Sequence, residues 1–239
     1  MERLKEKTVL MPFSVSVIIA AFNECESLEN VVNEASSELI HSHFYRYEII
    51  IIDDGSTDGT EKIVDGLEHK YPHVRVIHHN GNKGLGIVYK TGFDHAKHDF
   101  ITFYPADGQY PASNICRFTP MMNDFDLILG YLPTRKSSIY ANFLSNAEKI
   151  LFRLAFGKLP KFQGIFMLRK KVLNEIKLKS HGRAWTIVME LIIRMSRSSY
   201  RIVSIPIDMH PRLGGKSKVN NLKTILYSVK QLLILYTYL

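Results

Sequence analysis

Two adjacent aspartates, Asp53 and Asp54, follow four consecutive isoleucines at 49–52 and precede Gly55. Such an apolar run is typical of a strand buried on both faces of a parallel sheet. The carboxyl ends of these strands are where open α/β sheets bind ligands. Neighbouring carboxylates repel each other, so we expect their charges to be stabilised either by a bound ligand or by contacts within the fold. The alternative is an acidic turn that caps the next helix.

Asp107 and Gln109 lie two residues apart in a polar turn after the apolar segment 100–104. In an extended turn this spacing lets both side chains point the same way. Mg²⁺ and Mn²⁺ prefer oxygen ligands and take only one or two from the protein when phosphates and water complete the shell. The pair therefore predicts a metal site completed by a diphosphate, with a plain Asp-Gly turn as the alternative.

Two basic loops are candidates for binding phosphate. Lys83 lies in a loop of turn-forming residues at 80–84, and Arg212, Lys216 and Lys218 lie in the glycine-bearing loop 212–218. Side-chain cations and backbone amides on one loop can surround a phosphate together. The alternative for both loops is an ordinary solvated surface.

The elements that must position these residues alternate along the chain. The spacing of apolar residues predicts strands at 13–21, 48–52, 74–78 and 100–104 and helices at 28–40, 61–70 and 87–96. This rhythm indicates an α/β fold with a doubly wound, mostly parallel sheet. Three strand ends, at residues 23–24, 53–54 and 107–109, should then meet at one crevice.

The second half of the chain continues the same domain. It predicts strands at 126–129, 166–169 and 200–207, helices at 171–176 and 187–195, and a basic amphipathic stretch at 133–160. Glu190 on the apolar helix has Arg194 four residues later, which favours a structural ion pair. We expect an N-terminal tail at 1–13, one catalytic domain at 14–218 and an amphipathic helix at 219–239.

The tyrosines of that C-terminal segment, Tyr227, Tyr236 and Tyr238, favour a helix that lies in a membrane interface. An ordinary packed terminal helix is the alternative. The sequence contains no run of 18 apolar residues and no signal-peptide pattern, so we expect neither a transmembrane helix nor a cleaved leader. Two cysteines in 239 residues give no disulfide framework. We therefore expect a cytoplasmic protein bound peripherally to a membrane.

The net charge of +8 suits an anionic partner, which could be a phosphate-bearing substrate, an acidic membrane or nucleic acid. Nucleic acid is the weakest of these, because the cations are dispersed and no nucleic-acid-binding motif accompanies them.

Several segments resemble a known family. The segments 17–24 and 53–60 resemble the opening of family 2 glycosyltransferases with the GT-A fold; they read Val17-Ile18-Ile19-Ala20-Ala21-Phe22-Asn23-Glu24 and Asp53-Asp54-Gly55-Ser56-Thr57-Asp58-Gly59-Thr60. Segments 164–169 and 205–218, with Glu190 and Arg194 between them, resemble the dolichyl- and polyprenyl-phosphate sugar synthases. The likeness runs from about residue 14 to residue 218.

The resemblance implies transfer of one sugar, with inversion, from a GDP- or UDP-linked donor to a polyprenyl or dolichyl phosphate. It assigns the nucleoside to Ala20, Phe22, Glu24, Asp53 and Asp54. It assigns Mg²⁺ or Mn²⁺ to Asp107 and Gln109, and phosphate to Arg212 and Lys218. It also implies a membrane surface as partner and leaves open a membrane-anchor subunit or a second copy of the chain.

The chain departs from the family in two places. The family usually has an acid where this chain has Pro105, so one metal ligand is missing. The segment 130–157 also matches the family's basic acceptor region poorly, which leaves Arg135, Lys136 and Ser145 as alternative contacts to the acceptor phosphate.

Three functions are compatible with these residues. A phosphate acceptor is already ionised near neutral pH and needs no general base, whereas a saccharide hydroxyl does. The sequence offers no clear base, which favours the phosphate acceptor. The alternatives are a family 2 transferase acting on a saccharide hydroxyl in cell-surface polysaccharide synthesis, and a nucleotide-sugar-binding subunit that has lost turnover.

Overall fold

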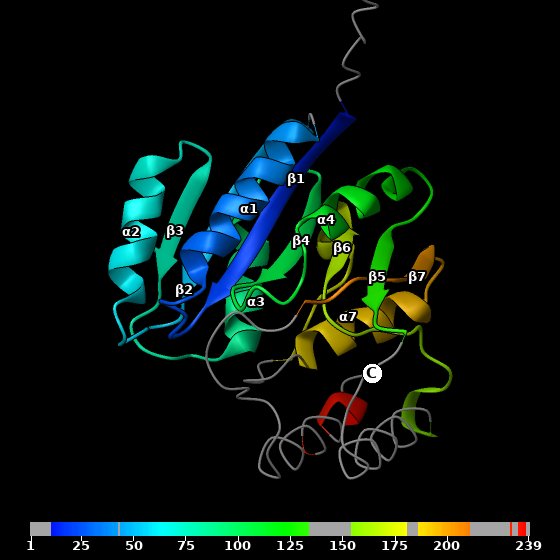
Figure 1. Ribbon diagram of the computed structural model, residues 1–239. Coiled ribbons are helices and arrows are strands. Elements are labelled where there is room, and N and C mark those ends of the chain that lie inside the picture. The colour runs from blue at the N-terminus through cyan, green and yellow to red at the C-terminus, as the bar shows by residue number, and fades with distance from the viewer. Residues whose placement is uncertain are drawn as a thin grey trace, which may run out of the picture.

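The computed structural model describes residues 11–42, 44–133, 154–180, 186–210, 230 and 234–237 of the chain. These residues form one seven-stranded sheet with the order β3-β2-β1-β4-β6-β5-β7 (Figure 1). The strands are β1 Met11–Ala21, β2 Phe44–Asp53, β3 Val74–His78, β4 Phe100–Pro105, β5 Leu127–Tyr131, β6 Phe166–Arg169 and β7 Ile202–Pro206. Among them β6 alone runs against its neighbours, β4 and β5.

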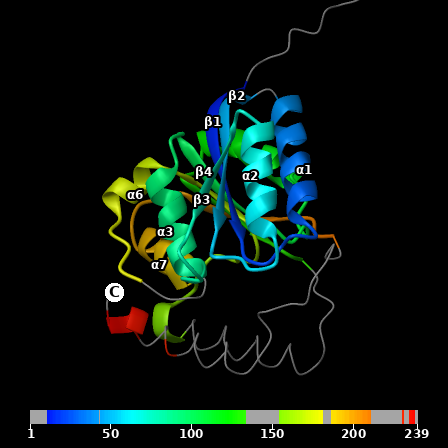
Figure 2. The same cartoon turned by 90° about the vertical axis from the view of Figure 1, so that its left-hand side faces the viewer.

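Helices cover both faces of the sheet, as Figure 2 shows from the side. They are α1 Leu28–His41, α2 Thr60–Lys70, α3 Leu85–His95, α4 Ser113–Phe118, the 3₁₀ helix η1 Thr119–Asn123, α6 Lys171–Glu175 and α7 Thr186–Ser196. Helices α1, α2 and α4 pack on one face, and α3, α6 and α7 pack on the other. The predicted doubly wound, mostly parallel α/β architecture is confirmed.

The central strands feed both cores because successive side chains of a strand point to opposite faces. Val17 and Ile19 of β1 join the core under α1 and α2, and Ile18 between them joins the core under α3 and α7. The isoleucines of β2 divide in the same way. Burial on both faces explains why these strands read as unbroken apolar runs.

The register of the parallel strands brings their carboxyl ends to one edge. Ala21 of β1 pairs with Asp53 of β2, which pairs with His78 of β3. On the other side of β1, Ala20 pairs with Pro105 of β4. The loops that follow these four strands therefore begin next to one another, at the lower edge of the sheet in Figure 1.

The predicted strands and the five helices predicted for the described part of the chain are confirmed, with shifts of a few residues at their ends. Helix α3 begins at Leu85 rather than at residue 87, after Gly84 in a positive-φ conformation. Helices α4 and η1 have no counterpart in the sequence prediction. Both are short, and Pro120 interrupts the apolar spacing.

The C-terminal segment lies mostly outside the described residues. In its described turn at 234–237, Leu235 packs against Phe156 and Ile193, while Tyr236 is 63% exposed. No helix within the described ranges is both long and apolar enough to span a bilayer.

Two helical glycines give opposite predictions for the same substitution. A Cβ at Gly92 of α3 would lie 2.7 Å from the buried side chain of Ile18, whereas a Cβ at Gly66 of α2 would meet nothing within 4 Å. We expect Gly66→Ala to raise the free energy of unfolding by about 0.5–1 kcal/mol through helix propensity. Gly92→Ala should lower it by about 1–3 kcal/mol through overpacking. Urea unfolding of both variants measures this, and equal effects would contradict the packing described for α3.

Candidate functional site

The carboxylate of Asp54 holds the loop that follows β3. Its side chain is 3% exposed. Its Oδ1 accepts the backbone N–H of Lys83 at 3.0 Å, and its Oδ2 accepts that of Gly84 at 2.8 Å. The ring of His79 adds a third contact, from Nδ1 to Oδ1 at 2.7 Å, and its Nε2 lies 2.9 Å from Thr91 Oγ1 on α3. The charge of Asp54 is thus stabilised by three contacts from one segment, the loop at 79–84.

Asp53 is equally buried and holds its own loop. Its Oδ1 accepts the N–H of Ser56 at 3.1 Å, and its Oδ2 lies 3.1 Å from Nδ1 of His78. Burial lowers the pKa of His78, but its bonds to Asp53 and Asp65 outweigh burial and raise the pKa above its usual value. The two adjacent aspartates therefore point to opposite sides, one toward each histidine of the pair 78–79.

Asn23 and Glu24 join the loop after β1 to the segment after β2 through three hydrogen bonds. Asn23, which has a left-handed φ of 53°, donates its N–H to Ser56 Oγ at 3.0 Å and accepts the N–H of Thr57 at 2.8 Å. Asparagine tolerates this conformation better than most residues. The N–H of Glu24 is bonded to Thr60 Oγ1 at 3.0 Å. These contacts make the first two loops one unit.

Asp58 adds further hydrogen bonds within these two loops. Its Oδ1 accepts the N–H of Thr60 at 3.0 Å and the hydroxyl of Thr60 at 2.6 Å, and its Oδ2 accepts the N–H of Cys25 at 3.3 Å. Burial raises the pKa of Asp58, but the hydrogen bonds from Thr60 and Cys25 outweigh burial and lower the pKa to about 2.

The second and third loops approach each other at two glycines. A Cβ built on Gly55 would lie 2.4 Å from the Cα of Gly81, and both residues have positive φ. Glycine is required at Gly55 for space as well as for conformation. Lys83 follows in the third loop with an exposed side chain, and its backbone is held by Asp54.

The fourth loop carries Asp107 and Gln109. It is tied to the first loop by the hydroxyl of Ser27, which donates to the carbonyl of Ala106 at 2.7 Å. Within it, Asp107 Oδ1 accepts the N–H of Gln109 at 3.1 Å, around Gly108 at a φ of 68°. The carbonyl of Gln109 accepts the N–H of His210 at 2.7 Å, so the segment after β7 reaches this turn.

The structure thus gathers the predicted residues of the first half of the chain at one edge. Ala20 is half-buried near the end of β1, and Phe22 and Glu24 are half-buried in the first loop. Asp53 ends β2, and Asp54, Lys83, Asp107 and Gln109 lie in the adjoining loops. Six predicted residues lie outside the described residues: Arg135, Lys136, Ser145, Arg212, Lys216 and Lys218. Arg212 is two residues beyond His210 in the chain.

Within the described ranges, no group of three or more His, Cys, Asp and Glu side chains is arranged to hold a metal ion. At the fourth loop the protein offers the half-buried carboxylate of Asp107 and the side chain of Gln109, while Pro105 pairs with Ala20 and has no ligand atom. This set of two oxygens fits a hard cation that takes its other ligands from a diphosphate and water.

Several positioning residues were not predicted from the sequence. His79, Ser27 and His210 make contacts with residues from other segments of the chain.

The prediction for Glu190 is confirmed: it is fully buried, and its Oε1 accepts a hydrogen bond from Arg194 Nε at 2.8 Å. Glu190 also accepts the N–H groups of Lys179 and Ser180. Burial raises the pKa of Glu190, and these bonds outweigh burial and lower it.

Comparison with known proteins identifies relatives of the chain. A family model described as "Glycosyl transferase family 2" matches residues 16–177. A dolichol-phosphate mannosyltransferase of Pyrococcus furiosus is 31% identical over 221 residues, which are 88% of this chain and 60% of the relative. The protein of the same name from Saccharomyces cerevisiae is 25% identical over 238 residues, 95% of this chain and 89% of the relative. The chain thus spans about three fifths of the length of the Pyrococcus relative.

Solved structures share the fold. The glucosyl-3-phosphoglycerate synthase of Mycobacterium tuberculosis, in complex with UDP, has a TM-score of 0.68 at 16% identity and covers 94% of this chain and 80% of its own. A mannosyltransferase of Pyrobaculum calidifontis in complex with GDP-Man and Mn²⁺ has a TM-score of 0.60 at 16% identity, with coverage of 97% and 74%. The GT-A fold expected from the resemblance is confirmed.

Removal of the Asp54 carboxylate tests its role in the loops. Asp54→Ala leaves the buried ring of His79 and two N–H groups without their acceptor, so we expect the free energy of unfolding to fall by about 2–4 kcal/mol. Hydrogen exchange at the amides of Lys83 and Gly84 should accelerate. The matched control is Asp65→Ala on the exposed surface of α2, where loss of an ion pair costs about 0–1 kcal/mol. Similar losses in both variants would contradict the assigned role.

Asp58 gives a prediction about pH. Its pKa of about 2 in the folded chain lies below the value of about 3.9 for an unfolded aspartate. The stabilisation it provides is therefore complete above about pH 4 and is lost as the pH falls toward 2. We expect wild type to exceed Asp58→Asn in free energy of unfolding at pH 6, with a smaller difference at pH 3. Urea titrations at both values measure it, and a constant difference would refute the prediction.

Proposed function

The chain belongs to glycosyltransferase family 2, and from that membership we propose that it transfers one sugar from a GDP- or UDP-linked donor to a polyprenyl or dolichyl phosphate. The main observation in support is the arrangement of the loops at the carboxyl edge of the sheet. Four loops are bonded to one another there, and the carboxylate of Asp107 remains partly accessible among them. The relatives named for dolichol-phosphate mannosyl transfer support the acceptor class.

In this proposal the nucleoside lies against Ala20, Phe22 and Glu24. Asp53 and Asp54 contribute by holding the loops, because their oxygens already accept bonds from Ser56, Lys83, Gly84 and the two histidines. Lys83 faces the donor phosphates as an exposed cation. A binding surface held in advance in this way loses little conformational entropy when the donor binds.

Asp107 and Gln109 would hold Mg²⁺ or Mn²⁺, which supplies positive charge to the leaving diphosphate when bound. The mannosyltransferase complex with GDP-Man and Mn²⁺ supports this assignment. Arg212 would add a side-chain cation to the same phosphates, and Lys216 and Lys218 follow in the same loop. The hydrogen bond between His210 and Gln109 supports a position for this loop near the donor.

The proposed chemistry is an in-line displacement. An oxygen of the acceptor phosphate attacks the anomeric carbon of the sugar, the bond from that carbon to the diphosphate breaks, and the configuration inverts. The phosphate is already ionised, so the chain needs no general base and acts by positioning and charge stabilisation. Arg135 and Ser145 are the proposed contacts to the acceptor.

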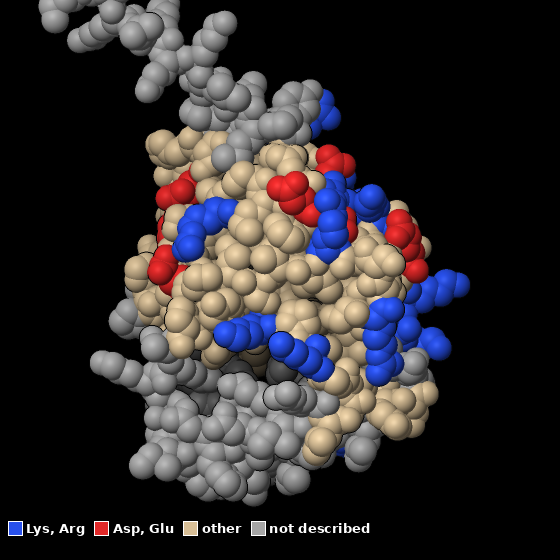
Figure 3. Space-filling view, turned by 90° about the vertical axis from the view of Figure 1, so that its right-hand side faces the viewer, with Lys and Arg blue, Asp and Glu red and all other residues tan. Residues whose placement is uncertain are grey.

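A lipid acceptor requires contact with a membrane, and we propose peripheral binding at its cytoplasmic face. Two apolar side chains near the C-terminal turn are exposed, Leu154 at 79% and Tyr236 at 63%. Exposed cations occur in the same half of the chain, at Lys158, Lys161, Lys177, Lys179 and Arg197. In Figure 3, the Lys and Arg side chains in the lower part of the described surface have no acidic neighbours, whereas basic and acidic side chains are mixed in the upper part. This combination suits an anionic lipid surface.

Within this proposal, residues 14–218 form the catalytic domain and residues 219–239 form an interfacial amphipathic helix. The tail predicted at 1–13 is shorter than expected, because residues 11–13 already belong to β1. A membrane-anchor subunit or a second copy of the chain could complete the membrane contact.

Pro105 favours a second candidate, a nucleotide-sugar-binding subunit without turnover. The strand ends there without the usual acid, so the protein supplies fewer metal ligands. Tight donor binding without transfer under any divalent metal would support this alternative. Transfer to a soluble saccharide but not to a polyprenyl phosphate would instead favour a polysaccharide transferase.

A donor panel against a polyprenyl phosphate, with and without Mn²⁺, tests the proposal. We expect transfer from one nucleotide-sugar that depends on the metal and falls at least 100-fold in Asp107→Ala, which corresponds to about 2.7 kcal/mol of barrier. The matched control is Asp94→Ala, an exposed acid on α3, which should retain wild-type activity. Full activity in Asp107→Ala would remove the assigned metal role.

A further inference from the structure

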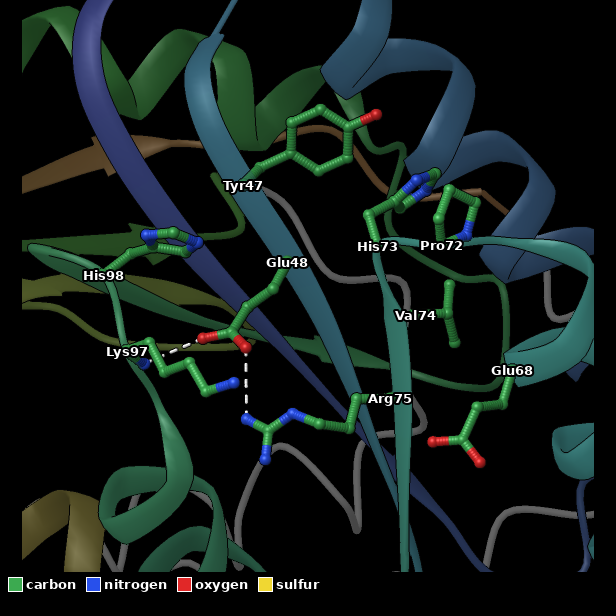
Figure 4. A pocket seen from close by; sticks show the side chains of 9 residues that line it. All are labelled: Tyr47, Glu48, Glu68, Pro72, His73, Val74, Arg75, Lys97 and His98. Carbon is green, nitrogen blue, oxygen red and sulfur yellow. Dashed lines mark hydrogen bonds and ion pairs between the residues drawn. The ribbon is translucent and has the colours of Figure 1, made fainter.

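Two cavities lie at the amino-terminal edge of the sheet, opposite the edge that carries the proposed donor site. They have volumes of about 480 and 510 Å³ and share Lys97 and His98 from the turn before β4. The first cavity is drawn in Figure 4. Neither cavity includes a residue of the four carboxyl-edge loops.

In the first cavity the main charges are already compensated. Glu48 of β2 accepts the N–H of Lys97 at 2.7 Å, the hydroxyl of Ser16 at 2.6 Å and Arg75 Nη2 at 3.1 Å. Figure 4 shows its carboxylate between the backbone of Lys97 and the guanidinium of Arg75. Glu68 accepts the N–H of Val76 at 2.8 Å. This network closes the end of the sheet and does not require a ligand.

The second cavity has cations without partners. It is lined by Phe13, Lys97, His98, Asp99, Phe100, Arg169, Lys170, Lys171 and Asn174. Within the described part of the chain, the ammonium groups of Lys97, Lys170 and Lys171 make no hydrogen bond and no ion pair. The one acid of the lining, Asp99, accepts a hydrogen bond from Ser14 Oγ at 2.8 Å. The lining therefore carries uncompensated positive charge, which favours an anion.

The remaining lining is fixed in place. Phe13 and Phe100 pack edge to face with ring centroids 5.4 Å apart. Arg169 lies over the ring of Phe100 at 5.0 Å and is held by Asp126 and by the carbonyl of Met122. The N–H of Lys170 donates to the carbonyl of Asp99 at 2.7 Å, which joins the turn before β4 to the start of α6. The cavity thus has a rigid aromatic wall and a cationic rim.

His98 lies between the two cavities and adds no charge at neutral pH. Burial lowers its pKa first of all, and Arg46 and Lys97 lower it further against the opposing effects of Glu48 and Asp99. A neutral imidazole still has one N–H group that can donate a hydrogen bond to an anion.

We propose that this second cavity is a binding site for a small phosphate-bearing anion, held by Lys97, Lys170 and Lys171. The site is separate from the proposed donor site and does not depend on the proposed transfer reaction. β4 connects the two regions: Phe100 at its start lines the cavity, and Asp107 follows its end.

Isothermal titration of the full chain with inorganic phosphate and with pyrophosphate tests the site. We expect binding to wild type and an affinity at least fivefold weaker in Lys97→Gln/Lys171→Gln. Both side chains are exposed, so the fold should tolerate the change. The matched control is Lys62→Gln/Lys70→Gln, which removes the same charge from α2 and should keep wild-type affinity.

Loss of affinity in both double variants would indicate a general charge effect and overturn the proposal. Absence of binding to wild type would also overturn it. Binding that is unchanged in Lys97→Gln/Lys171→Gln but lost in Lys83→Gln would place the anion at the carboxyl edge and refute this site. Activity in the donor panel is a separate measurement, so failure of the proposed transfer leaves this result unaffected.

Discussion

The hydrogen bonds of the buried carboxylates Glu48, Asp53 and Asp54, on and just after β2, are the interactions on which the rest of the structure depends. A parallel sheet ends by releasing its chains into loops whose N–H groups no longer have strand partners. Asp53 and Asp54 accept such groups from Ser56, Lys83 and Gly84 at the carboxyl end. Glu48 likewise accepts the N–H of Lys97 at the amino edge of the sheet. A charged acceptor makes these bonds stronger than neutral ones, and it is stable under burial because several donors surround it.

This arrangement separates the acids that hold the site from the acid that is available to a ligand. Asp53, Asp54 and Asp58 each accept two or more hydrogen bonds from the protein. Asp107 accepts the N–H of its own turn and stays half-buried. The family signature around residues 53–60 therefore fixes the geometry of the loops at the carboxyl edge, where the donor is proposed to bind. Pro105 has no side-chain oxygen, which leaves Asp107 and Gln109 as the proposed metal ligands of the fourth loop.

The two edges of the sheet use charge differently. At the carboxyl edge Asp53 and Asp54 are buried and hydrogen-bonded, while Asp107 stays half-buried. At the amino edge the buried acid Glu48 is paired with Arg75, while Lys97, Lys170 and Lys171 line a second cavity together with a single acid, Asp99. Both edges are rigid because the same central strands, β1 and β4, pass through both cores.

The sequence by itself determined the elements, their alternation and the family, because apolar periodicity and strand-end motifs are local properties of the chain. It also predicted the pair Glu190–Arg194, which is one helical turn apart. Tertiary structure alone decided that Asp54 meets His79, that Ser27 meets Ala106 and that Gln109 meets His210. Each of these contacts joins residues from different loops, and the register of the parallel strands sets their distances. The amino-edge cavity has the same origin, because its walls come from β1, the turn before β4 and the start of α6, which no local pattern relates.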